Sequence, residues 1–360
     1  MTIIINNIRY ELKNISTNSH IMDENYPLNK HILKLFRIWI LGVKEFEIST
    51  SGSTGETKNI ILKREWLEVS ALQTINLLNL WNEKVLCCLP IYKIGGLMMI
   101  IRALIADFDI QIIEPKSDPM AEIDIDHLFS FVSLVPSQLK IILESPESVV
   151  KLNRFKNILL GGADINNQLL LGIQTLRPNV FHTYGMTETC SHIALKKLNN
   201  NAWASFKPNP FVELKTNSNG LLSIKAYQTG NEWVDTNDVV KLYPNGSFDF
   251  LGRADFLINT GGFKVFPEQL EIKIKNILNK NNWDINLAIT SIPNDKWGEE
   301  IVLIFINNLH SDSEIFEVLR PILKNYELPK RIVKIESIPL NEGGKIDRLE
   351  LRNIILRVIP

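Results

Sequence analysis

Residues 49–58, with the sequence STSGSTGETK, combine glycines, hydroxyl side chains and a lysine. Glycine lets a backbone approach a bulky anion, and exposed N–H groups and hydroxyls donate hydrogen bonds to its oxygens. Lys58 adds a full positive charge, so the stretch predicts a loop that binds a polyphosphate. It is not a Walker A loop, because Thr57 stands where that motif requires its second glycine. The alternative interpretation is a flexible turn or linker.

Three later segments carry further polar groups of the kinds that bind a nucleotide. In residues 182–189 (HTYGMTET), Tyr184 offers a flat face for a base, Thr187 a hydroxyl for a phosphate, and Glu188 a hard oxygen ligand for Mg²⁺. A carboxylate and a guanidinium from residues 235–238 and 252–255 could bind the hydroxyls of a ribose. Residues 341–348 (NEGGKIDR) place a lysine after two glycines. Each segment alone could be a surface turn or a helix cap, but their joint occurrence favours a nucleotide site.

The composition limits the classes of protein. A chain of 360 residues with 45% hydrophobic content can bury a large core, and two domains are more probable than one. Its 39 basic and 40 acidic side chains nearly cancel, which argues against non-specific nucleic-acid binding. The three cysteines form no CxxC pair, and no targeting or membrane-spanning segment stands out, so we expect a cytoplasmic protein.

The predicted helices and strands, taken in chain order, indicate which fold positions these segments. Apolar runs typical of strands alternate with helical segments up to about residue 200, which indicates an α/β domain with a largely parallel sheet. The Asn-Gly turns at 219–220 and 245–246 then predict a small antiparallel section. A new mixed unit follows residue 252. We therefore expect an N-terminal domain at 1–252 and a small α+β domain at 253–360, with helices at 267–278 and 313–324.

The segments, in this order, resemble those of the adenylate-forming superfamily of acyl-CoA synthetases, adenylation domains and luciferases. The resemblance covers nearly the whole chain from Ser49 onward and implies the fold of that superfamily: a large α/β domain, here shortened at its N-terminus, and a small mobile domain. It implies ATP and CoA as co-substrates with Mg²⁺ as cofactor. The implied catalytic residues are Lys345, Thr187 and Glu188, with Glu188 as the metal ligand. The implied ATP-binding residues are Thr50, Ser51, Gly52, Ser53, Thr54, Gly55, Lys58, Gly162, Tyr184, Gly185, Asp238 and Arg253. Asp255, Gly261 and Gly262 are implied for the hinge and the CoA channel.

Within the superfamily, residues 184–194 (YGMTETCSHIA), 133–139 (SLVPSQL) and 96–102 (GLMMIIR) look like segments of the o-succinylbenzoate–CoA ligases of menaquinone biosynthesis. This narrower resemblance implies that the acyl substrate contacts Arg102, Lys93, Ser191 and His192. Arg102 would face the second carboxylate of the substrate, since a guanidinium can bind a carboxylate through two parallel hydrogen bonds. Alternatively, an arginine on an apolar helix is a structural partner for a buried carbonyl.

The sequence departs from the family pattern at several positions. Thr-Asn-Asp at 236–238 replaces the usual Thr-Gly-Asp, and Lys93 stands where many relatives have histidine. Another aryl- or acyl-CoA ligase and a stand-alone amino-acid adenylation enzyme therefore remain as alternatives. The implied partners are a carboxylic acid, ATP and CoA, without nucleic acid, and a homodimer is left open.

Overall fold

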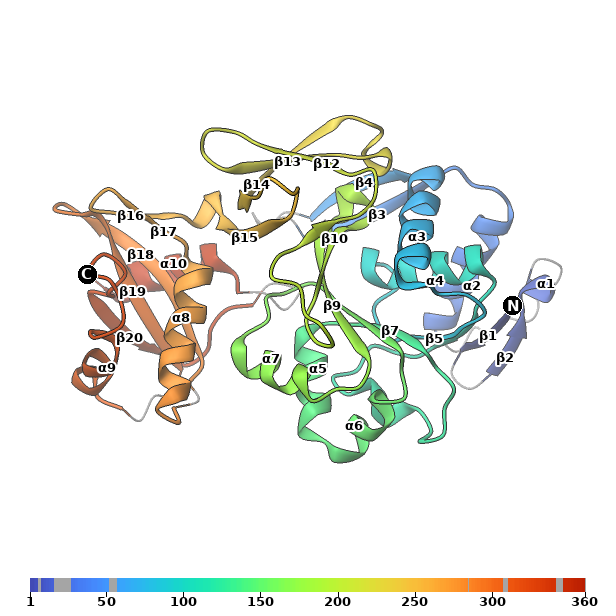
Figure 1. The fold of residues 1–360 in the computed structure, drawn as a ribbon, viewed down its shortest axis with the longest axis horizontal. Coiled ribbons are helices and arrows are strands. Elements are labelled where there is room, and N and C mark those ends of the chain that lie inside the picture. The colour runs from blue at the N-terminus through green and yellow to red at the C-terminus, as the bar shows by residue number, and fades with distance from the viewer. Residues whose placement is uncertain are drawn as a thin grey trace.

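The computed structural model describes residues 1–5, 8–15, 27–51, 57–283, 285–306, 310–340 and 346–359, with the side chains at 27–28, 50–51 and 57–58 left out. Three sheets follow one another along these residues, and a separate hairpin lies, in the chain, between strands β2 and β5 of the first sheet (Figure 1). Within the described ranges, no helix combines the length and the apolar character needed to cross a bilayer.

The first sheet is mostly parallel, as the alternation of apolar runs predicts. Its strand order is β11-β10-β9-β8-β7-β5-β6-β1-β2. The strands from β9 to β1 pair in parallel, whereas the pairs β1–β2, β9–β10 and β10–β11 are antiparallel. The strands are β1 (Thr2–Ile5), β2 (Ile8–Glu11), β5 (Lys84–Cys87), β6 (Asp109–Ile112), β7 (Phe131–Leu134), β8 (Asn157–Leu160), β9 (Asn179–Met186), β10 (Ser191–Lys197) and β11 (Lys207–Pro208).

Helices cover both faces of this sheet, because alternate strand residues point to opposite sides and nearly all are apolar. Val85 and Cys87 join the core cluster under α2, α3 and α4, whereas Leu86 joins the cluster under α5, α6 and α7. The helices are α1 (Leu12–Ile15), α2 (Pro27–Ile40), α3 (Arg64–Leu78), α4 (Ile94–Ala106), η1 (Pro119–Glu122), α5 (Pro136–Glu144), α6 (Pro146–Leu152) and α7 (Asn167–Gln174). The sequence reading missed α6, which begins with Pro146 after the capping side chain of Ser145.

An antiparallel sheet follows, as the Asn-Gly turns predict. It consists of β12 (Glu213–Thr216), β13 (Leu221–Lys225), β14 (Trp233–Leu242) and β15 (Phe248–Arg253), with the short helix η3 (Tyr227–Thr229) between β13 and β14. Another short helix, η2 (Thr187–Thr189), connects β9 and β10 of the first sheet. The hairpin of β3 (Glu45–Ser51) and β4 (Thr57–Lys63) forms a separate two-stranded sheet.

The last part of the chain forms a mixed sheet of its own, drawn in orange and red in Figure 1. After η4 (Ala254–Phe256) come β16 (Ile258–Thr260), β17 (Phe263–Val265), α8 (Pro267–Lys280), β18 (Leu287–Asn294), β19 (Gly298–Ile306), α9 (Asp312–Leu319), β20 (Arg331–Ile335) and α10 (Arg348–Val358). α8 and α9 pack on one face and α10 on the other. The helix expected at 313–324 ends at Leu319, because Pro321 cannot continue it. α10 was missed by the sequence reading. The predicted domain boundary at 252/253 stays a prediction.

Candidate active site

The predicted phosphate loop connects two paired strands. The register of β3 and β4 runs from Glu45↔Lys63 to Ser51↔Thr57 and includes the pair Thr50↔Lys58. Gly52, Ser53, Thr54 and Gly55 lie outside the described residues, as do the side chains of Thr50, Ser51 and Lys58. Their roles in binding phosphate remain predictions.

The segment with Thr187 and Glu188 is a tight connection between β9 and β10. A Cβ atom at Gly185 would lie 2.2 Å from the backbone oxygen of Ser191, so only glycine fits at this position of the hairpin. Thr189 is fully buried, and its hydroxyl contacts the backbone of Met186 and donates to the Ser191 oxygen at 2.7 Å. Ser191 itself has a φ of +96°, a region that favours glycine, which is the kind of strain found at functional sites. These contacts hold η2 in one conformation.

Glu188 is the exposed member of this rigid connection, and its carboxylate has no hydrogen-bond or ion-pair partner among the described residues. η2 also lies beside β4, the strand that follows the predicted phosphate loop. The described part of the chain holds no group of three or more His, Cys, Asp or Glu that could bind a metal. A single carboxylate near phosphates fits Mg²⁺, which is usually held by one or two carboxylates, substrate phosphates and water.

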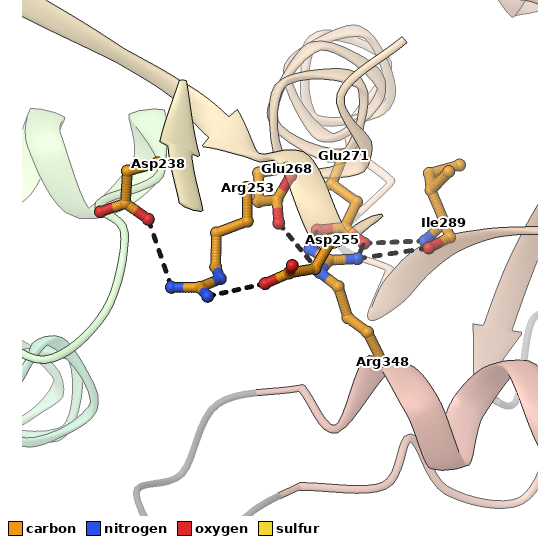
Figure 2. Close-up of polar contacts among 7 residues, drawn as sticks. All are labelled: Asp238, Arg253, Asp255, Glu268, Glu271, Ile289 and Arg348. Atoms are coloured by element: carbon orange, nitrogen blue, oxygen red, sulfur yellow. Dashed lines mark hydrogen bonds and ion pairs between the residues drawn. The ribbon is translucent and has the colours of Figure 1, made fainter. Parts of the chain in front are cut away.

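A chain of polar contacts joins four of the predicted site residues: Tyr184, Asp238, Arg253 and Asp255. The Tyr184 hydroxyl donates to Oδ2 of Asp238 at 2.6 Å. Arg253 lies between two carboxylates, with Nη1 3.3 Å from Oδ1 of Asp238 and Nη2 2.7 Å from Oδ2 of Asp255 (Figure 2). Burial raises the pKa of Tyr184, and the charge of Asp238 raises it further, so the phenol keeps its proton.

The ring of Tyr184 packs against two aromatic side chains, Phe248 of β15 and Phe206 just before β11. Its centroid lies 5.0 Å from that of Phe248 and 5.9 Å from that of Phe206, both in edge-on geometry. The sequence reading gave Tyr184 only a stacking role, and it missed this anchoring function, which depends on residues far away in the chain. Both oxygens of Asp238 keep lone pairs that can accept further hydrogen bonds, as binding to a ribose would require.

Arg102 is the residue that the narrower resemblance assigned to the second carboxylate of the substrate. It lies on α4 with 2% exposure, and Nε and Nη2 have no hydrogen-bond partner among the described residues. Nη1 lies 3.9 Å from the sulfur of Met99. Burial without a compensating anion lowers the pKa of Arg102 to about 9. The alternative of a buried carbonyl partner therefore finds no support within the described part of the structure.

His192 is buried close enough to Arg102 to feel its charge. Burial and the guanidinium together lower the pKa of His192 to about 3, so the imidazole is neutral. Its Nε2 lies 3.3 Å from the hydroxyl of Thr74 on α3. Ser70, one turn earlier on α3, donates to the Cys190 oxygen at 2.7 Å. The sequence reading missed Ser70 and Thr74, which carry no local signal for this role.

Other predicted site residues lie at the ends of elements. Lys93 is the half-buried residue that precedes α4, and Gly162 lies in the exposed loop after β8. Gly261 and Gly262 form the two-residue turn between β16 and β17, with φ values of +58° and +82°, which suit a hairpin turn that favours glycine at both positions. Lys345 lies outside the described residues, so its placement stays a prediction.

Comparisons with known proteins identify the family of this chain. The family model described as "AMP-binding enzyme" matches residues 48–243, more than half of the chain. The chain belongs to this family. The AMP-binding enzymes are thus the class that the sequence resemblance predicted, and both the enzyme class and the fold are confirmed.

Several individual proteins are similar to this AMP-binding enzyme over most of its length. A 2-succinylbenzoate–CoA ligase of Staphylococcus epidermidis (strain RP62A) is 26% identical over 352 residues, which are 91% of this chain and 73% of that protein. A solved acyl-CoA synthetase (AMP-forming)/AMP-acid ligase II-like protein from Dyadobacter fermentans is 31% identical, with a TM-score of 0.64, and the match covers 96% of this chain and 99% of that one. An o-succinylbenzoate CoA synthetase from Bacillus subtilis shares the fold, with a TM-score of 0.72 at 22% identity over 85% of this chain and 68% of that one.

Proposed function

We propose that this AMP-binding enzyme is an AMP-forming acid–CoA ligase whose acid is o-succinylbenzoate, an aromatic dicarboxylate. The observation that carries the choice of acid is the buried guanidinium of Arg102, whose Nε and Nη2 atoms have no hydrogen-bond partner among the residues that the structure describes. A buried charge without a partner is unfavourable, and a carboxylate that binds both atoms offsets that cost. The 2-succinylbenzoate–CoA ligases among the relatives support the same acid.

In the first half-reaction, an oxygen of the succinyl carboxylate attacks the α-phosphorus of ATP. The bond from that phosphorus to the bridging oxygen breaks, and diphosphate leaves with its electron pair. Residues 50–58 would hold the β- and γ-phosphates, Asp238 the ribose hydroxyls, and Lys345 the charge that develops at the α-phosphate. Glu188 would hold Mg²⁺, which neutralises phosphate charge when bound.

In the second half-reaction, the CoA sulfur attacks the acyl carbon of the adenylate. The bond to the AMP oxygen breaks, AMP leaves, and the thiol proton is released. Gly261 and Gly262 would line the path of the thiol, because a turn without side chains leaves room for a narrow ligand. We further propose Mg²⁺ as the cofactor, a role in menaquinone biosynthesis and a cytoplasmic location.

The test compares o-succinylbenzoate with 4-oxo-4-phenylbutanoate, which lacks only the ring carboxylate, by diphosphate release. We expect a higher kcat/KM for the dicarboxylate. Arg102→Met should remove most of that preference, since losing the partner of a buried carboxylate costs about 2–5 kcal/mol. The KM for ATP should stay nearly the same, and Arg37→Met, on the exposed side of α2, is the control.

Equal kcat/KM for the two acids in the unmodified enzyme would contradict the proposed substrate. A preference for benzoate, a fatty acid or an amino acid would point to one of the alternative ligases. If the unmodified enzyme releases no diphosphate from ATP with any of the acids, the ligase function itself is contradicted.

A further inference from the structure

Arg102 makes one hydrogen bond among the described residues, and its acceptor is a sulfur atom. Nη1 donates to the thioether of Met99, three positions earlier on α4, at 3.9 Å. Nε and Nη2 have no hydrogen-bond partner in the same part of the structure. These two nitrogens form one edge of the planar guanidinium, whereas Nη1 lies at its other end. The contact with Met99 therefore leaves available the edge whose two N–H groups can bind both oxygens of a carboxylate.

The Met99 sulfur is itself held by a side chain of the large sheet. The hydroxyl of Ser133 on β7 donates to it at 3.1 Å, and both residues are buried. Ser133 lies two positions after Phe131, which shares a core cluster with Met99, so both side chains of the strand point towards α4. A hydroxyl of β7, a thioether and a guanidinium of α4 thus contact one another in sequence.

A thioether suits this position because it carries no charge. A carboxylate in place of Met99 would orient the guanidinium more strongly, but it would also neutralise the guanidinium and compete with a substrate carboxylate. Sulfur is a weak, polarisable acceptor, so it can fix the direction of Nη1 while the positive charge stays available. Ser133 is neutral as well. The two side chains therefore orient Arg102 without acting as its counter-ion.

We propose that Met99, held by Ser133, is a positioning residue for Arg102 that selects which edge of the guanidinium meets the acid: Nη1 stays on the sulfur, and Nε and Nη2 bind the ring carboxylate. The inference rests on the proposed function, in which Arg102 binds that carboxylate. Neither Met99 nor Ser133 has to contact the substrate. Without the sulfur, the guanidinium loses its single orientation before the acid binds, and binding has to supply that order.

The test measures diphosphate release by Met99→Leu with two acids. Leucine keeps nearly the same volume, so the variant should fold, but it offers no acceptor to Nη1 or to the Ser133 hydroxyl. We expect the KM for o-succinylbenzoate to rise about fivefold, as the loss of one modest hydrogen bond predicts. The kcat with that acid and the KM for 4-oxo-4-phenylbutanoate, which lacks the ring carboxylate, should stay nearly unchanged. A loss of packing alone would raise the KM for both acids.

Met98→Leu is the matched control, because Met98 is the neighbouring fully buried methionine of α4 and its sulfur has no hydrogen bond among the described residues. It should leave the KM for both acids unchanged. Ser133→Ala should raise the KM for o-succinylbenzoate about twofold and add nothing in the Met99→Leu background, since the hydroxyl acts through the sulfur. An equal rise for both acids in Met99→Leu, the same rise in Met98→Leu, or additive effects of the Met99 and Ser133 variants would overturn the proposal.

NMR of protein with ¹⁵N-labelled arginine tests the orientation without using activity. The Nη1 and Nη2 signals of Arg102, assigned through Arg102→Met, should be separate, because only Nη1 contacts sulfur. Rotation about the Nε–Cζ bond exchanges them, and it should be about fivefold faster in Met99→Leu and unchanged in Met98→Leu. An unchanged rotation rate in Met99→Leu would overturn the proposal. If the unmodified enzyme shows no preference for o-succinylbenzoate, the proposed function is wrong, and the rotation rate still decides whether Met99 holds Arg102.

Discussion

At the scale of single residues, the site keeps two basic side chains in the core. Arg102 and His192 are both almost inaccessible, and burial lowers the pKa of each, while the charge of Arg102 lowers the pKa of His192 further. The imidazole responds by staying neutral, while the guanidinium needs an anion. Arg102 is thus the residue available to a negatively charged group of the substrate, and His192 is a neutral neighbour that contacts Thr74.

The neutral state of His192 predicts how stability depends on pH. Its pKa of about 3 in the folded protein is depressed below the unfolded value of about 6.5, so the stabilisation is complete above pH 6.5 and is lost as the pH falls towards 3. At pH 5 the loss is about 2 kcal/mol. Urea unfolding of His192→Gln should therefore show a free energy that falls about 2 kcal/mol less between pH 7 and pH 5 than that of the unmodified protein.

His31→Gln, on the exposed side of α2, is the control and should follow the unmodified protein. If His192→Gln and His31→Gln lose the same free energy of unfolding between pH 7 and pH 5, His192 does not titrate as the buried geometry requires.

At the scale of elements, the β9–β10 hairpin decides where Thr187 and Glu188 lie. The hairpin is closed so tightly at Gly185 that backbone from β10 occupies the place of a side chain. α3 supports the other side through Ser70 and Thr74. The short helix η2 has little core of its own, so its conformation depends on these neighbours.

Gly185→Ala should therefore break the site as well as the fold. Its Cβ would meet the Ser191 oxygen at 2.2 Å and the His192 Cα at 2.6 Å, and backbone cannot move aside as a flexible side chain can. We expect a loss of at least about 3 kcal/mol of unfolding free energy, measured by urea denaturation. The activity in diphosphate release should fall with it, because η2 moves.

Gly172→Ala, within α7, is the matched control. Its Cβ would meet only the side chain of Leu143 in α5, with the nearest atom at the tip, 2.6 Å away. Its cost should stay within about 1 kcal/mol, because alanine also favours the helix. Equal losses for the two glycine variants would show that the closeness of the hairpin strands has no special importance.

At the scale of the whole molecule, η4 is the short link between the sheet that ends with β15 and the sheet that begins with β16. Asp255 in this link contacts Arg253 and accepts a hydrogen bond from Asn237 at 2.9 Å. The proposed chemistry needs Lys345 in one half-reaction and the Gly261–Gly262 turn in the other. A rotation about Asp255 would exchange them.

The variants Lys345→Ala and Asp255→Pro should separate the half-reactions. Lys345→Ala should abolish acyl-adenylate formation and leave thioester formation from supplied adenylate largely intact. Asp255→Pro should leave acyl-adenylate formation largely intact and abolish thioester formation, because proline fixes φ at the link and restricts the preceding residue. Asp255→Asn keeps the freedom of the backbone and is the control. If both variants slow both half-reactions equally, domain rotation is not the mechanism.

The sequence by itself determined the features that depend on short segments and on their order along the chain. The two Asn-Gly turns follow from neighbouring residues, and the parallel sheet and the family follow from the order of short segments along the chain; the structure and the comparisons confirm them. The predicted helix ends differ from the observed ones by a few residues. The sequence reading also missed α6 and α10, because tertiary packing rather than local propensity stabilises such short helices.

Only the tertiary structure decided which side chains meet. Tyr184 donates to Asp238, and Arg348 joins Glu268 and Glu271, through contacts between distant parts of the chain. For Arg102, the structure decides that Nε and Nη2 have no partner among the described residues. A motif gives the type and order of its residues. The distance and burial that turn a charged residue into an anchor or a ligand arise only when separate elements pack together.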